Sequence, residues 1–122
     1  MAQSPASVWD GVYSDGQAGR GAALYQAGCA SCHGDKLQGK GPTPALAGSD
    51  FVTNWSGMTI GDLFDKIQSS MPADKPGSLS REQSANLVAY LLSANKFPSG
   101  KADLSSDTER LRQIRLEAAP AK

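Results

Sequence analysis

The sequence predicts an all-α fold of three to five short helices, and three observations support this prediction. Three segments open with Ser or Thr followed three positions later by Gln or Asp, at Ser14, Thr59 and Ser80, the pattern of an N-terminal capping box. Apolar residues inside these segments recur at helical spacing. No stretch of the sequence shows a convincing strand pattern of alternating apolar and polar residues.

The first predicted helix covers about residues 17–27. Gly21, Leu24 and Tyr25 share one of its faces, and Gly28 ends it. A glycine inside a helix lowers helix stability. We therefore expect Gly21 to be the point at which another helix crosses closely.

The second predicted helix begins after Thr59 and ends before Pro72. Its apolar residues fall at positions i, i+3, i+4 and i+7, namely Ile60, Leu63, Phe64 and Ile67. The third predicted helix opens at Ser80 and runs to about Asn95, and Pro98 prevents much extension.

The remaining segments are predicted to be loops and extensions. Residues 34–57 are rich in Gly, Pro, Ser and Thr, which predicts a long loop of the kind that is usually functional or wrapped around something. Apolar residues in the tail predict a weak final helix or an ordered strap. We expect one domain at residues 14–100, with an N-terminal extension at 1–13 and a C-terminal extension at 101–122.

Charge and hydropathy exclude two classes of function. The 12 Lys and Arg residues balance the 12 Asp and Glu residues, whereas a nucleic-acid-binding protein would show a basic excess. No apolar run approaches the roughly 20 residues that span a bilayer. We therefore expect neither nucleic acid as a partner nor a transmembrane segment.

Cys29-Ala30-Ser31-Cys32-His33 is a C-x-x-C-H run, the attachment signature of a covalently held c-type haem. Two thiols three positions apart on a helical turn can each add to a haem vinyl group, and the adjacent His33 then reaches the iron as proximal ligand. Cys29 and Cys32 are the only cysteines, and His33 is the only histidine. The run predicts one haem c, bound covalently through both cysteines.

Three other interpretations of this run are weaker. A disulfide between Cys29 and Cys32 would close a tiny, strained loop, and a thioredoxin-like pair would need a βαβ pattern nearby. A structural zinc site needs four protein ligands, one more than these residues supply. Because haem is normally attached outside the cytoplasm, we expect a periplasmic or otherwise exported protein whose leader has been removed, since residues 1–6 do not resemble a signal peptide.

The second axial ligand of the iron would have to be a methionine, because no second histidine exists. Met1 lies at the end of the chain, and Met58 immediately precedes the second predicted helix. Met71 lies just past that helix, where Pro72 stiffens the backbone, so we favour Met71 over Met58. The alternative for Met71 is that it fills a gap in the core. A thioether ligand stabilises Fe(II) and raises the reduction potential.

With these residues placed, the chain resembles the class I cytochrome c family over about residues 17–97. The resemblance rests on four motifs, Gly21-x-x-x-Tyr25, Pro44-Ala45-Leu46-Ala47-Gly48, Met71-Pro72 and Ala89-Tyr90-Leu91. It implies an all-α cytochrome c fold wrapped around one haem, in which the first and last helices cross nearly at right angles.

The resemblance also implies roles for Pro44 and Trp55. In the family a proline carbonyl accepts a hydrogen bond from the proximal histidine, which points to Pro44, with Pro42 as a rival. Such a bond fixes the orientation of the ring and raises the basicity of the ligand. A tryptophan donates its indole N–H to a haem propionate in some members. Trp55 is the candidate for that role, and the alternative is that it belongs only to the core.

These features predict a one-electron carrier with His33 and Met71 as iron ligands, rather than an enzyme. The segment from Met71 to Pro98 resembles cytochrome c domains that accompany quinoprotein dehydrogenases in bacteria, so an electron-accepting module of a larger periplasmic dehydrogenase is an alternative. A ligand-binding or sensing haem domain with a labile distal site is a third possibility. The expected partners are redox proteins, a dehydrogenase as donor and an oxidase or other protein as acceptor.

Overall fold

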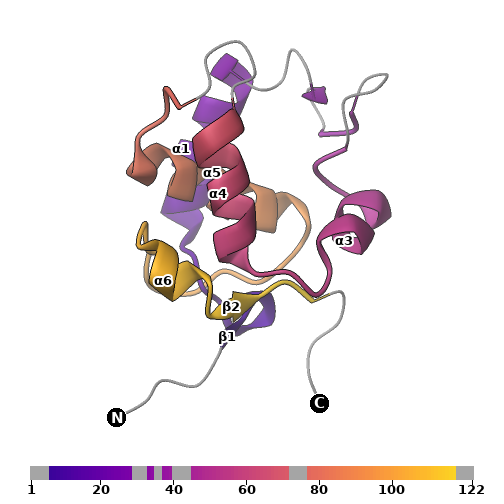
Figure 1. The fold of residues 1–122 in the computed structure, drawn as a ribbon, viewed down its shortest axis with the longest axis vertical. Helices are drawn as coiled ribbons and strands as arrows, with labels where there is room; N and C mark the ends of the chain where they lie inside the picture. Colours follow the sequence, from indigo (N-terminus) through magenta and orange to yellow (C-terminus); the bar gives the residue numbers. More distant parts are fainter. Residues whose placement is uncertain (1–5, 29–32, 35–36, 40–44, 72–76, 118–122) are drawn as a thin grey trace.

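The computed structural model describes residues 6–28, 33–34, 37–39, 45–71 and 77–117. Within these ranges the chain is helical, which confirms the all-α prediction (Figure 1). The helices are α1 (Asp15–Gly28), α3 (Ser49–Trp55), α4 (Ile60–Ser70), α5 (Arg81–Ala94) and α6 (Thr108–Leu111), and a single 3₁₀ turn spans Val8–Asp10. None of these helices is long and apolar enough to cross a membrane.

Helices α1 and α5 make the most extensive contact between elements in the described part of the chain. Gly21 of α1 lies against the backbone carbonyl of Asn86 and the Cβ of Tyr90, and a Cβ at position 21 would overlap both. The rings of Tyr25 and Tyr90 meet beside this point, with centroids 5.3 Å apart. The predicted close crossing at Gly21 is therefore present.

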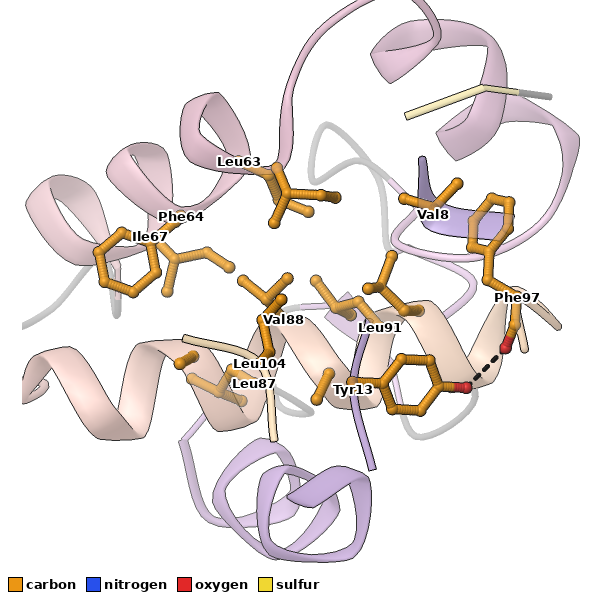
Figure 2. Packing of buried hydrophobic residues seen from close by; sticks show 14 of the residues in the cluster. Val8, Tyr13, Leu63, Phe64, Ile67, Leu87, Val88, Leu91, Phe97 and Leu104 are labelled. Carbon is orange, nitrogen blue, oxygen red and sulfur yellow. Dashed lines mark hydrogen bonds between the residues drawn. The ribbon is translucent and has the colours of Figure 1, made fainter. Parts of the chain in front are cut away.

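Helix α4 covers the other side of α5. Leu63 and Phe64 are almost completely buried, and together with Ile67 they point towards Val88 and Leu91 of α5 (Figure 2). This packing explains the apolar stripe of the second predicted helix, because residues three and four positions apart share one helix face.

The predicted capping boxes are complete at two of the three helices. The side chains of Thr59 and Ser80 accept hydrogen bonds from the backbone N–H groups of Asp62 and Gln83, respectively. In return, the side-chain oxygens of Asp62 and Gln83 accept from the backbone N–H groups of Thr59 and Ser80. At α1 only half of the box forms, since the Gln17 N–H donates to the Ser14 hydroxyl. The Gln17 side chain instead turns to the tail.

Gln17 binds the backbone of Leu104 in both directions. Its Nε2 donates to the Leu104 carbonyl at 3.0 Å, and its Oε1 accepts from the Leu104 N–H at 2.6 Å. Gln17 is buried, with 2% of its surface exposed, so both bonds are shielded from water. The capping-box interpretation of the Gln17 side chain was wrong, because this side chain bonds the N–H and the carbonyl of Leu104 instead of the N–H of Ser14.

The two extensions meet at one end of the molecule. Strands β1 (Ala6–Ser7) and β2 (Ile114–Arg115) form a parallel pair, with Ala6 opposite Ile114 (Figure 1). The Trp9 indole donates to the Glu117 carbonyl at 3.0 Å, and the Ser7 hydroxyl donates to the Glu117 carboxylate at 2.7 Å. This short pairing was not predicted, because two-residue strands leave no sequence pattern.

The tail belongs to the same core as the helices. Leu104, Leu111, Ile114 and Leu116 are buried in a single cluster with the helical residues. An exposed ion pair of 3.0 Å between Arg112 and Asp65 holds the tail against α4, where Gly61 leaves room for the Arg112 backbone. The ordered strap that was predicted is thus present, with one helical turn, α6, inside it.

Helix α3 lies within residues 34–57, which were predicted to be a loop. Its N-cap is Gly48, which has no side chain to cap the helix, so the capping signal that marks the other helices is missing. Figure 1 shows α3 standing apart from the body formed by α1, α4 and α5. The long connection therefore carries a short helix that sequence periodicity did not reveal.

Gly21→Ala is expected to lower the free energy of unfolding by about 1–3 kcal/mol, because the added methyl group overlaps the rigid backbone of α5. Gly19→Ala is the matched control on the same helix, where nothing lies within 4 Å of the added group. The control is expected to raise the free energy of unfolding by about 0.5–1 kcal/mol through helix propensity. Guanidinium unfolding of the haem-loaded protein measures both, and an unchanged or more stable Gly21→Ala would contradict the close crossing.

Leu111→Ala is expected to lower the free energy of unfolding by about 2–5 kcal/mol, because Leu111 is fully buried and its loss leaves a cavity. Arg110→Ala, at the exposed neighbouring position, is expected to change it by less than about 0.5 kcal/mol. Urea unfolding followed by circular dichroism distinguishes the two. Equal effects would mean that the tail does not contribute to the core.

Candidate haem-binding site

The His33 segment follows α1 in the chain. His33 is buried, with 5% of its surface exposed, and its carbonyl accepts a hydrogen bond from the Gly39 N–H at 2.7 Å. The next carbonyl, that of Gly34, accepts a 2.6 Å hydrogen bond from the hydroxyl of Tyr25, which lies in the last turn of α1. Helix α1 therefore holds the backbone directly after the predicted proximal ligand.

Four residues to which the sequence analysis gave a role in the site lie outside the described residues. These are Cys29, Cys32, Pro44 and Pro72, and the rival Pro42 lies outside them as well. Covalent attachment and the hydrogen bond to His33 from a proline carbonyl therefore stay predictions. His33, Trp55 and Met71 can be placed.

The backbone turns sharply at Leu37. This buried residue adopts a left-handed conformation with φ of 61°, which costs a residue other than glycine about 1–2 kcal/mol. Its N–H donates to the Gly34 carbonyl at 3.2 Å, and its carbonyl accepts from the Leu46 N–H at 2.8 Å. The turn thus connects the His33 segment to the segment that contains Leu46.

Asn95 fastens the Leu46 segment to the end of α5. The Asn95 amide donates to the Leu46 carbonyl at 3.0 Å and accepts from the Gly48 N–H at 2.9 Å. The same amide nitrogen donates to the Leu91 carbonyl at 2.8 Å, inside α5. Sequence analysis missed this contact, because an asparagine at a helix end is equally suited to cap its own helix.

Trp55 lies at the end of α3 and is half-buried. Its ring packs on Phe51, with centroids 6.4 Å apart and an angle of 37° between the planes. Phe51 itself is almost completely buried. Trp55 thus packs against the core. Among the described residues no hydrogen-bond partner of its indole is found, so donation to a propionate stays a prediction.

Met71 and Met58 lie at opposite ends of α4. The 11 residues of α4 span about 16 Å, at 1.5 Å per residue. Met58 is 41% exposed, and its carbonyl accepts from the Leu116 N–H beside β2. Met71 is half-buried against the core, in an extended conformation with φ of −117° and ψ of 148°.

The end of α4 that carries Met71 is also the end at which α1 finishes. Figure 1 shows the C-terminal ends of α1 and α4 at the same end of the molecule, away from the β1–β2 pair. Since the predicted proximal ligand follows α1 within five positions, Met71 is the methionine on the side of His33. Met58 lies at the end where the two extensions meet.

The residues around these segments fit a haem group. Apolar side chains pack against the core on one side while remaining partly exposed, as the macrocycle of a haem requires of its surroundings; they include Leu46, Ala47, Val52, Trp55, Met71 and Leu79. One imidazole and one thioether, the donor pair of a low-spin electron-transfer haem, come from the segments after α1 and α4. The donor set and the presence of these partly exposed apolar side chains therefore both fit a haem group.

Burial raises the pKa of Tyr90, the tyrosine of α5 that packs on α1, above its ordinary value. Its ring packs on Tyr25, whose hydroxyl holds the Gly34 carbonyl. Burial thus favours the uncharged form of the Tyr90 hydroxyl between α1 and α5.

Comparison with known proteins agrees with this description. Residues 16–91 match the family described as cytochrome C oxidase, cbb3-type, subunit III. Cytochrome c-554(547) of Halothiobacillus neapolitanus is 36% identical over 86 residues, which cover 62% of this chain and 94% of that protein. The cbb3-type cytochrome c oxidase subunit CcoP of Azospirillum brasilense is 33% identical over 92 residues, which cover 62% of this chain and 30% of that protein.

A solved structure shares the fold. The sulfane dehydrogenase SoxCD of Paracoccus pantotrophus contains a chain that aligns with a TM-score of 0.58 and 29% identity, covering 88% of this chain and 61% of that chain. The fold and site define a c-type cytochrome. The chain belongs to the cytochrome c family represented by the cbb3-type subunit III domain, a family of haem-dependent electron carriers whose cofactor is haem c.

Proposed function

We propose that this protein carries single electrons on one haem c, attached through Cys29 and Cys32, with His33 and Met71 as the axial ligands. The observation that supports this most directly is the position of the only histidine, which is buried beside the end of α1 and held there by Tyr25 and Gly39. The bound haem supplies an Fe(III)/Fe(II) couple.

The chain's own residues set the environment of that couple. Cys29 and Cys32 fix the group to the chain, and His33 donates an imidazole nitrogen. The carbonyl of Pro44 would accept a hydrogen bond from the other ring nitrogen of His33, and this bond would hold the ring in one orientation. Met71 contributes a neutral, polarisable thioether, which favours Fe(II) and raises the potential. Trp55 would donate its indole N–H to a propionate.

A carrier follows from this ligand set more readily than an enzyme. If His33 and Met71 both held the iron, they would leave no position on it for a substrate or a gas. Electrons would then pass through the edge of the macrocycle to a docked partner. Small and weak interfaces are typical of such encounters.

A second candidate function is that of an electron-accepting module in a larger dehydrogenase. It is supported by the alignment of 88% of this chain with part of a sulfane dehydrogenase chain. The alignment leaves out more than a third of that chain, so the activity of the dehydrogenase itself is not transferred. Either way, the partners would be redox proteins, a dehydrogenase as donor and an oxidase or other acceptor, and the protein would work in the periplasm.

Met71→Ala is expected to remove the long-wavelength absorption band that reports iron–thioether bonding in the ferric protein, because it deletes the sulfur. It is also expected to lower the reduction potential and to let the reduced protein bind carbon monoxide. Optical spectroscopy, redox titration and carbon monoxide addition measure the three effects.

Met58→Ala is the matched control, since Met58 lies at the other end of α4 and is the more exposed of the two. It should leave the band and the potential unchanged. Loss of the band in Met58→Ala but not in Met71→Ala would assign the ligand to Met58. Ready carbon monoxide binding by the unmodified protein would favour the sensing alternative over the carrier.

Replacing both Cys29 and Cys32 by serine is expected to give little mature haem protein, because the vinyl groups then lack both thiols. In the unmodified protein the haem should remain with the polypeptide through acid–acetone extraction and denaturing electrophoresis. Haem staining of the gel measures this. Quantitative release of haem from the unmodified chain would contradict covalent attachment.

A further inference from the structure

Gln68 lies in the last two turns of α4 and makes two hydrogen bonds to other parts of the chain. Its Nε2 donates to the carbonyl of Leu79 at 3.0 Å. Its Oε1 accepts from the hydroxyl of Ser84 at 2.7 Å. Ser84 lies in the first turns of α5 and is fully buried, so the second bond fixes the orientation of the amide.

The two anchors of the segment between α4 and α5 converge on this turn of α4. At its start, the Met71 N–H donates to the Ile67 carbonyl at 3.0 Å. At its end, Leu79 is bonded to Gln68, one residue further along the same helix, and its side chain is half-buried against the core. Met71 and Leu79, which lie on either side of positions 72–76, are thus both bonded to the last turn of α4, and the capping box of Ser80 follows Leu79 directly.

We infer that Gln68 is a positioning residue for the axial methionine, and this inference rests on the proposed function because it takes Met71 as the ligand. A thioether stays on the iron against competing ligands only while the chain keeps the sulfur close, at a high effective concentration. The bond from Gln68 keeps Leu79 on the turn of α4 that directly precedes Met71, which limits how far the chain beyond Met71 can draw the sulfur away. Gln68 therefore slows the loss of the thioether.

The alternative is that Gln68 only joins α4 to α5. The two hydrogen bonds allow these roles to be separated. Gln68→Glu keeps an acceptor for the Ser84 hydroxyl and removes the donor to the Leu79 carbonyl. Ser84→Ala removes the bond between the helices and leaves the bond to Leu79.

The experiment measures imidazole binding to the ferric haem-loaded protein by stopped-flow absorption. At saturating imidazole the rate is limited by departure of the thioether. Gln68→Glu is expected to raise this limiting rate about fivefold, the effect of losing one hydrogen bond of ordinary strength. Ser84→Ala is expected to raise it less than twofold.

Gln83→Glu is the matched control for charge. It adds the same carboxylate near the end of the segment, while the acceptor that Gln83 offers to the Ser80 N–H is retained. Its limiting rate should equal that of the unmodified protein. Gln68→Ala replaces Gln68→Glu as the test variant if the latter does not fold, and should accelerate imidazole binding to a similar degree.

Three results would overturn the inference. An unchanged rate in the Gln68 variants would remove any role for this side chain. A rate raised equally in Gln83→Glu would assign the effect to charge, and one raised equally in Ser84→Ala would assign it to helix packing. Failure of the proposed ligation is distinct, because the unmodified ferric protein would then lack the iron–thioether band in every preparation.

Discussion

The contact between α1 and α5 at Gly21 is the constraint on which the rest of the structure depends. Because no side chain separates the two backbones there, the crossing has one geometry. Helix α1 then delivers Tyr25 to the carbonyl that follows His33. Helix α5, fixed at the same point, offers Ser84 towards its beginning and Asn95 at its end, where each bonds one side of the predicted site. Both predicted axial ligands are thus positioned with respect to a single crossing.

Amide side chains connect the segments that lie outside the helices. Gln17 holds the tail at Leu104, Gln68 holds Leu79, and Asn95 holds the Leu46 segment. A chain with long irregular connections has backbone donors and acceptors that no sheet pairs, and each left unpaired in the interior would cost about 1–3 kcal/mol. An amide carries both a donor and an acceptor, so one side chain can satisfy a peptide group or bridge two elements. This accounts for an uncharged polar side chain as completely buried as that of Gln17.

Local signals predicted the fold, and the failures have a common cause. Capping boxes at Thr59 and Ser80 involve residues three positions apart, so the sequence contains the whole interaction. The β1–β2 pair joins segments more than a hundred positions apart and leaves no such trace. Helix α3 has Gly48 as its N-cap and therefore no capping side chain. Gln17 matches the capping-box pattern, but its side chain bonds the distant backbone of Leu104 instead. Elements set by neighbours along the chain were predictable, whereas those set by tertiary contacts were not.

The same division applies to the site. The predicted ligands follow from composition, because one histidine and three methionines leave little choice. The structure adds that α4 ends beside Met71, and not beside Met58, at the end of the molecule where α1 also ends. The contacts that fasten the segments around these predicted ligands are made at long range, by side chains bonded to backbone groups 11 and 49 positions away. A Gln or an Asn in a helix carries no signal of such a partner, because its ordinary place is the solvated face. The contacts that would hold the predicted ligands in place are therefore visible only after the chain has folded.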